Sequence, residues 1–336
     1  MPDYFLNNNQ PIIDKSPHTV VAFTRFQRTY WVILLFGNDN KQQKIHYEIE
    51  MVFSNNDGRN IFYINKKEVY LHDTVPSAIV DRLSAECGKV LYPLQITVSN
   101  QGVFTAVYNI EVIKKRWQDK KPSLQQYYNG PVAQSIINSM DKALSDKALV
   151  YNALAQDWFY TLFFAPVYHV HKPGHLCNAD IRLPFESYNK PVLFNVQQTG
   201  VEALTVDGHI EVKVQGNCAD PRSLEDILKG YPIPVSKAAT GICTVATGMV
   251  SLVYKLNPVN LNIFSITGNC KMNLHNGKQK TVTVEVYNLT EKDKTPKPGT
   301  RYNIMDDAVI RLIMCQNSQT DLVPELKIFY FINFNI

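Results

Sequence analysis

The sequence lacks the features that mark membrane-spanning and nucleotide-binding proteins. Its longest apolar runs, at 30–36 and 158–167, are far shorter than the roughly 20 residues that cross a bilayer. The N-terminal stretch 1–16 has no basic segment followed by an apolar one, so no signal peptide is expected. The phosphate-loop patterns GxGxxG and GxxxxGK[ST] and the nucleophile pattern GxSxG are absent. We therefore expect a soluble, cytoplasmic protein without a membrane span, and we do not expect an enzyme from motifs alone.

Charge is also scarce. Charged residues make up 19% of the 336 residues, below the usual quarter, and the net charge is only +4. Such a chain presents broad neutral surfaces or surfaces that a partner covers. The basic segment 114–121, KKRWQDKK, could bind nucleic acid, but Trp117 is in helical phase with Ile110 and Ile113 and is better read as core. No nucleic-acid partner is expected.

Closely spaced cysteines are missing as well. The chain has six cysteines with wide spacings and no CxxC pair. Scattered cysteines in a chain of this length, with no leader expected, behave more often as small buried hydrophobic residues than as disulfides. The six are Cys87, Cys177, Cys218, Cys243, Cys270 and Cys315.

The alternation of apolar residues predicts an α+β fold, mostly antiparallel sheet, in two β-rich halves with a central helical layer at about 109–165. The predicted organisation is an N-terminal arm at 1–18, a β-rich half with the helical block at 19–165, and a second β-rich half at 166–336 packed on the first. Whether the two halves are a duplication stays open.

Several elements have specific patterns. Segment 44–53 alternates strictly and predicts a strand with one wet face, whereas 61–64 and 68–71 around the polar NKK predict a hairpin. Asp220 is expected to cap a short helix. The last helix of the block is apolar on all sides from Trp158 to Phe164, which requires enclosure, so we expect three core residues: Phe159, Leu162 and Phe163.

The densest group of metal-binding side chains follows that helix. His169 and His171 fall on one face of an extended segment, and a Pro-Gly turn could return His175 or Cys177 toward them, with Asp180 nearby. Imidazole and thiolate together suit Zn²⁺. The spacing matches no common structural zinc pattern, and the alternative is a histidine-containing loop that leaves the buried helix.

These features favour a non-catalytic binding or scaffold protein. We expect a subunit or adaptor of a larger bacterial protein assembly, such as a secretion or contractile injection apparatus, with other protein subunits or copies of itself as partners. One alternative is an apolar-ligand (lipid) carrier with a pocket between a curved sheet and helices, lined by the segment 158–164. A second alternative is a zinc-dependent hydrolase that uses the cluster at 169–177. No cofactor other than this zinc is expected.

Overall fold

A computed structural model describes residues 26–38, 41–56, 58–168, 176–186, 189–201, 203–235, 245–274 and 277–289. The predicted arm at 1–18 and the part of the predicted second β-rich half from residue 290 to 336 lie outside these ranges. Cys243 and Cys315 lie outside them too. Among the described cysteines, Cys87 and Cys270 are buried, as expected from their spacing, while Cys177 and Cys218 are half-buried.

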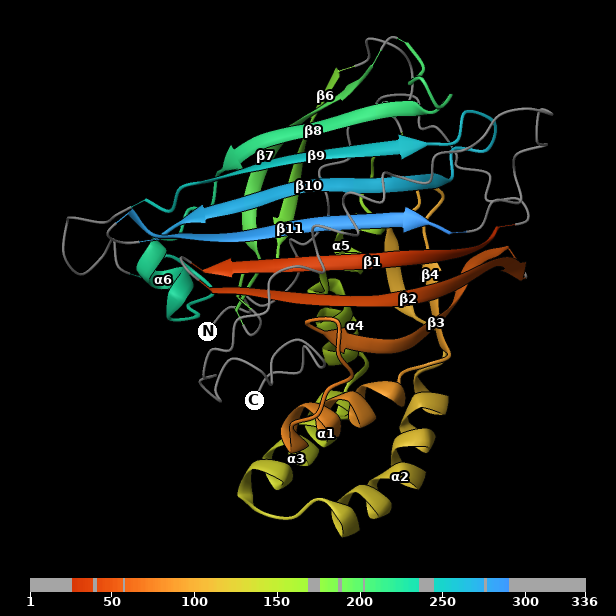
Figure 1. Ribbon diagram of the computed structural model, residues 1–336, viewed down its shortest axis with the longest axis vertical. Helices are drawn as coiled ribbons and strands as arrows, with labels where there is room; N and C mark the ends of the chain where they lie inside the picture. Colours follow the sequence, from red (N-terminus) through yellow and green to blue (C-terminus); the bar gives the residue numbers. More distant parts are fainter. Residues whose placement is uncertain are drawn as a thin grey trace, which may run out of the picture.

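The described strands form one open sheet of eleven strands in the order β5-β4-β3-β2-β1-β11-β10-β9-β8-β7-β6 (Figure 1). Each pair of neighbours is antiparallel, which confirms the predicted mostly antiparallel sheet. The strands are β1 (Gln27–Asn38), β2 (Lys41–Asn56), β3 (Arg59–Leu71), β4 (Leu94–Val98), β5 (Phe104–Val107), β6 (Leu176–Leu183), β7 (Val192–Gly200), β8 (Ile210–Cys218), β9 (Gly248–Leu256), β10 (Ile263–Asn273) and β11 (Gln279–Asn288).

Strand β1 joins the two β-rich runs of the sequence. It pairs with β2 along one edge and with β11 along the other, and the register places Tyr30 opposite Asn288 and Phe36 opposite Val282. The strands that precede the helical block and those that follow it therefore share one sheet. A single hydrogen-bonded ladder, β1–β11, holds the two runs in register.

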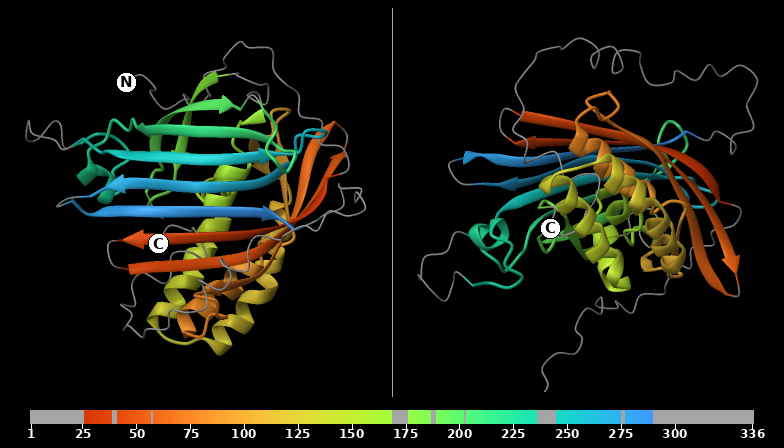
Figure 2. Two further views of the ribbon diagram at one scale, coloured as in Figure 1. Left: turned by 45° about the horizontal axis from the view of Figure 1, so that its top comes forward. Right: turned by 90° about the horizontal axis from the view of Figure 1, so that it is seen from below.

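The described helices are α1 (Ile79–Lys89), α2 (Ile110–Tyr127), α3 (Pro131–Ser145), α4 (Lys147–Ala155), α5 (Trp158–Phe163) and α6 (Leu224–Leu228). Helices α1, α2 and α3 gather at one end of the molecule (Figure 1), and the curved sheet arches over the helices (Figure 2). Helix α5 contacts β6 and β10, and α4 contacts β5. Within the described residues, no helix combines the length and apolarity that crossing a bilayer would require.

Strand β2 follows its predicted alternation. Ile45, Tyr47, Ile49 and Met51 are all buried on the face that meets the helices, which we call the inner face. On the outer face His46 departs from the expected wet position, because its ring stacks on that of Tyr70 and is buried. A histidine can be buried on an outer face where aromatic neighbours cover it.

The predicted hairpin at 61–71 is wrong. The polar NKK does not turn the chain, and β3 runs through it as one strand from Arg59 to Leu71. A β-bulge breaks the register here: Tyr47 pairs with Val69, whereas Ile49 pairs with Lys66. A bulge accommodates the extra residue and shifts the side-chain alternation by one position. The inner face therefore changes from even-numbered to odd-numbered residues across 66–69.

The apolar end of the helical block, from Trp158 to Phe164, is enclosed as expected. Phe159, Leu162 and Phe163 are buried, with at most 2% of each residue exposed. The ring of Phe163 packs edge-on against that of Tyr30, at 5.0 Å between centroids. The Tyr254 hydroxyl donates to the Leu162 carbonyl at 3.0 Å. The core prediction for these three residues is confirmed.

The cap predicted at Asp220 is displaced. Asp220 is instead paired with Arg222 at 2.7 Å in a buried ion pair. Ser223 caps α6, in a reciprocal capping box with Asp226. The short helix predicted here is present, but it begins at Leu224, three residues later than a cap at Asp220 implies, and Arg222 occupies the Asp220 carboxylate.

The enclosure of α5 predicts that one substitution weakens the whole sheet. Phe163→Ala removes a fully buried ring and should cost about 3–5 kcal/mol of unfolding free energy. Urea unfolding followed by far-UV circular dichroism should show one transition, moved to lower urea. Tyr127→Ala, at a residue 68% exposed, is the control and should change stability by less than about 1 kcal/mol. Two transitions, with only one of them shifted, would contradict a common core.

Candidate functional site

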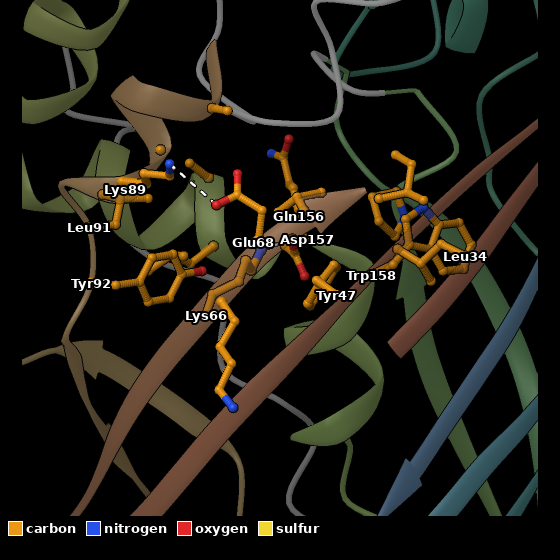
Figure 3. A pocket seen from close by; sticks show the side chains of 18 of the residues that line it. Leu34, Tyr47, Lys66, Glu68, Lys89, Leu91, Tyr92, Gln156, Asp157 and Trp158 are labelled. Atoms are coloured by element: carbon orange, nitrogen blue, oxygen red, sulfur yellow. Dashed lines mark ion pairs between the residues drawn. The ribbon is translucent and has the colours of Figure 1, made fainter. Parts of the chain in front are cut away.

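A cavity of about 90 Å³ lies between the inner face of β1–β3 and helices α1, α4 and α5 (Figure 3). Its walls are largely apolar. They include Leu34, Ile45, Val69, Leu91, Leu154 and Trp158. Polar side chains meet at the same cavity, from the bulge of β3 and from the turn between α4 and α5. An apolar cavity with a few convergent polar groups is the usual form of a small-molecule site.

The bulge in β3 explains why a lysine lines this cavity. Lys66 follows Phe62 and Ile64 in the inward phase and stands opposite the fully buried Ile49. The bulge lies after Lys66, so the alternation between inner and outer face shifts only beyond this residue. The lysine side chain exposes 17% of its surface. Its cation is thus placed at the apolar face of the sheet, where an unpaired charge would be costly.

Three neighbours offset that cost. The Lys66 Nζ lies 3.9 Å from the Asp157 Oδ2 and 4.3 Å from the centre of the Tyr47 ring, and the Tyr92 ring centre is 5.6 Å away. An ammonium over an aromatic face is attracted by the ring quadrupole. Burial lowers the pKa of Lys66, but Tyr92 and Asp157 outweigh it, so the net pKa lies above its usual value. Lys66 is therefore a cation at neutral pH.

Asp157 is held in place by its own helix. As N-cap of α5, its Oδ1 accepts from the backbone N–H groups of Phe159 at 2.8 Å and Tyr160 at 3.3 Å. This cap also divides the single last helix expected from the sequence into α4 and α5. Because the cap uses Oδ1, the other oxygen, Oδ2, is the one directed at Lys66.

Two of the three tyrosines near Lys66 satisfy each other. The hydroxyls of Tyr92 and Tyr160 share a hydrogen bond of 3.3 Å. The Tyr47 hydroxyl, in contrast, is buried and has no hydrogen-bond partner among the described residues. Burial raises the pKa of both Tyr47 and Tyr160 well above the usual value, and the Asp157 charge adds to this. Both phenols are thus neutral at physiological pH.

Charges beside the cavity are balanced as well. Glu68 and Lys89 both line the cavity and form an ion pair at 3.6 Å between the bulge and the end of α1 (Figure 3). Lys67 also lines the cavity, and it pairs with Glu48 at 2.8 Å and Glu50 at 3.0 Å. Each lysine that lines the cavity therefore has a carboxylate partner within 4.0 Å.

The polar groups at the cavity have defined protonation states at neutral pH. Lys66 is held protonated and Tyr47 is held neutral, so both side chains carry hydrogen-bond donors at the cavity. Asp157 is committed to its cap and its cation.

A second, more open cleft of about 690 Å³ lies at the β4–β5 hairpin and includes Tyr108 and Lys147. Its amides bond mainly to one another: Asn60 donates to Asn100 at 3.0 Å and accepts from Asn55 at 2.9 Å. These satisfied, exposed amides give the cleft fewer free groups for a ligand than the buried cavity has.

The predicted metal cluster falls mostly outside the described residues. His169, His171 and His175 lie in the undescribed segment 169–175. Cys177 lies in β6, half-buried, and its Sγ donates to the Asn178 carbonyl at 3.4 Å. Within the described ranges no group of three or more His, Cys, Asp or Glu side chains is placed to hold a metal ion. Zinc at 169–177 stays a prediction.

The basic segment 114–121 lies in α2, where Trp117 is buried as expected. The Trp117 Nε1 donates to Asp141 Oδ1 at 2.8 Å, and Lys121 contacts the other Asp141 oxygen at 2.7 Å. Lys120 pairs with Glu86 at 2.8 Å, and Lys114 with Glu111 at 3.2 Å. The buried indole is not free to stack on a base, and several of these cations already face carboxylates.

Sequence reasoning anticipated Trp158 as a wall of an apolar pocket but missed Lys66, Tyr47 and Asp157. A signal for Lys66 existed, since Phe62, Ile64 and Lys66 share one phase of the strand alternation. Comparison of the sequence with known proteins finds no family model that matches the chain and no curated protein significantly similar to it.

The buried phenols and Lys66 predict how stability changes in alkali. An unfolded tyrosine ionises near pH 10, whereas Tyr160 stays neutral in the fold, so its contribution is complete below about pH 10 and is lost as pH rises above it. Lys66, whose folded pKa is also raised, loses its contribution in the same direction, as pH rises through that folded pKa.

The measurement is the unfolding free energy in urea at pH 8, 10 and 11. Tyr160→Phe should make the loss above about pH 10 shallower by up to about 1.4 kcal/mol per pH unit. Tyr127→Phe, at an exposed ring, should leave the slope as in the parent protein. An unchanged slope in Tyr160→Phe would show that this phenol titrates alike in both states.

Proposed function

We propose that the protein is a non-catalytic binding protein that holds a small, mainly apolar ligand in the cavity between the sheet and helices α1, α4 and α5. The observation that carries this proposal is the apolar cavity with Lys66 and Tyr47 among its walls. The helical block supplies Ala153, Leu154 and Trp158. In this proposal the central helical layer expected at 109–165 acts through α4 and α5, which form the helical wall.

The volume limits what fits. A buried apolar cavity of about 150 Å³ admits benzene. A cavity of about 90 Å³ therefore accepts a short aliphatic group, or the end of a longer chain that continues through the mouth. A whole lipid does not fit inside, so the carrier expected from the sequence becomes a carrier for a smaller molecule.

Filling the cavity should weaken ligand binding strongly. Ala85 on α1 lines the cavity and is half-buried, so Ala85→Leu should extend into the space without overpacking the core. With 1-butanol as the probe, saturation-transfer NMR should detect binding to the parent protein and at least about tenfold weaker binding to Ala85→Leu. Ala148→Leu, at an exposed position on α4, is the matched control and should bind like the parent.

Native mass spectrometry of the protein from its expression host gives a second readout that is independent of the probe chosen. A co-purified small molecule that Ala85→Leu lacks would support the proposal. Absence of probe binding to the parent protein, or equal binding by the filled variant, would reject it.

A second candidate, the assembly subunit or adaptor, is favoured by the outer face of the sheet. Side chains on five neighbouring strands form one uncharged polar row through the pairings Gln197–Gln215, Gln215–Ser251, Ser251–Asn269 and Asn269–Thr283. Both glutamines and Asn269 are exposed. Charged residues are depleted at the cores of protein interfaces, so such a row suits contact with another subunit.

Assembly through this row predicts sensitivity to charge. The double variant Gln197→Glu with Gln215→Glu places two like charges opposite each other and should dissociate an oligomer or release a co-purified subunit. Sedimentation velocity should then show the 38.3 kDa monomer. Gln134→Glu, exposed on α3, is the control and should leave the assembly intact. A parent chain that sediments as a monomer and co-purifies with no subunit would reject this candidate.

A further inference from the structure

Resting on the proposed function, we infer that the cavity selects an uncharged ligand with one oxygen acceptor, such as a short ketone or alcohol, and that the Tyr47 hydroxyl donates to it. The inference comes from the contrast between Tyr47 and the other buried tyrosines, and from the charges that face the cavity.

Tyr47 differs from other buried tyrosines in that its hydroxyl has no hydrogen-bond partner within the described part of the chain. Tyr30 donates to the Ile263 carbonyl at 2.7 Å, Tyr254 to the Leu162 carbonyl at 3.0 Å, and Tyr160 bonds with Tyr92. Tyr47 is only 3% exposed, lines the cavity, and has no hydrogen-bond partner for its hydroxyl among the described residues. A buried hydroxyl without a partner lowers stability, so an acceptor brought by a ligand would relieve a cost already present.

The position of this hydroxyl is fixed by packing. Tyr47 is an inward residue of β2, opposite Val69 just beyond the bulge. The Lys66 ammonium lies over its ring at 4.3 Å. A ring held between a strand and a cation keeps its donor in one place, which favours a ligand that arrives with a matching acceptor. Burial raises the pKa of the phenol, which keeps the proton available for donation.

Charge balance excludes ionised ligands. Lys66 and Asp157 are 3.9 Å apart at the same cavity, so an anion would gain attraction from one and repulsion from the other. A carboxylate would therefore lose its hydration without net compensation, and an ammonium would do the same. Asp157 cannot move aside easily, because its Oδ1 holds the N-terminus of α5. A neutral carbonyl or hydroxyl avoids this cost.

The test is a set of four-carbon compounds that differ in charge: 2-butanone, 1-butanol, butyrate and butylammonium, titrated at pH 7 by NMR. The expected result is binding of the ketone and the alcohol, with butyrate and butylammonium at least about tenfold weaker. Tyr47→Phe should weaken 2-butanone about 3- to 10-fold, and its ligand-free Tm should rise by about 1–3 °C because the unbonded hydroxyl is gone.

Tyr254→Phe is the matched control. It removes a hydroxyl that is bonded and does not line the cavity, so its Tm should fall while its affinity for 2-butanone stays within twofold of the parent. If none of the four compounds binds the parent protein, the proposed function fails and the inference with it. If butyrate binds as well as 2-butanone, or if Tyr47→Phe binds the ketone unchanged, the cavity still binds ligands but this selectivity is wrong.

Discussion

The burial of helix α5 against the curved sheet is the interaction on which the rest of the structure depends. The helix has six residues, and five of them are buried. A helix this short does not persist alone in water, since its nucleation is costly and it gains few hydrogen bonds. It persists here because strands from both runs of the sequence surround it, each buried aromatic or leucine side chain contributing about 1.5–3 kcal/mol, while Asp157 satisfies its first N–H groups.

The same arrangement creates the cavity. Because the helix turn must place Asp157 at the start of α5, a carboxylate is brought to the inner face of a sheet that is otherwise apolar there. Lys66, next to the bulge in β3, is the cation that compensates this carboxylate, and its ammonium lies over the ring of Tyr47. One structural need, the capping of a buried helix, thus entails a small set of polar side chains that line an apolar space. Where a buried polar group is needed for folding, its neighbours become available for recognition.

The local sequence pattern predicted much of the fold but few of the residues at the candidate site. The alternation of β2 and the uniformly apolar end of the helical block were legible because burial imposes a period of 2 on strands and enclosure on such helices. The β1–β11 ladder could not be predicted from the sequence, since the pairing of two distant segments produces no pattern within either segment. The three polar residues of NKK indicated a turn, and only tertiary packing showed that the second of them points inward before a bulge. The Tyr47 hydroxyl lacks a hydrogen-bond partner among the described residues because of where side chains from several elements lie, and residue spacing does not predict those positions.

The β1–β11 ladder also orders events during synthesis. Asn38 meets Lys280, so the ladder cannot begin until 242 further residues have been made, which takes about 12–48 s at about 5–20 residues per second. Throughout that interval β1 keeps one edge without the strand that pairs with it in the folded protein. The nascent chain is therefore exposed to wrong pairing for much of its translation, and slower or faster translation changes how long a chaperone has to protect that edge.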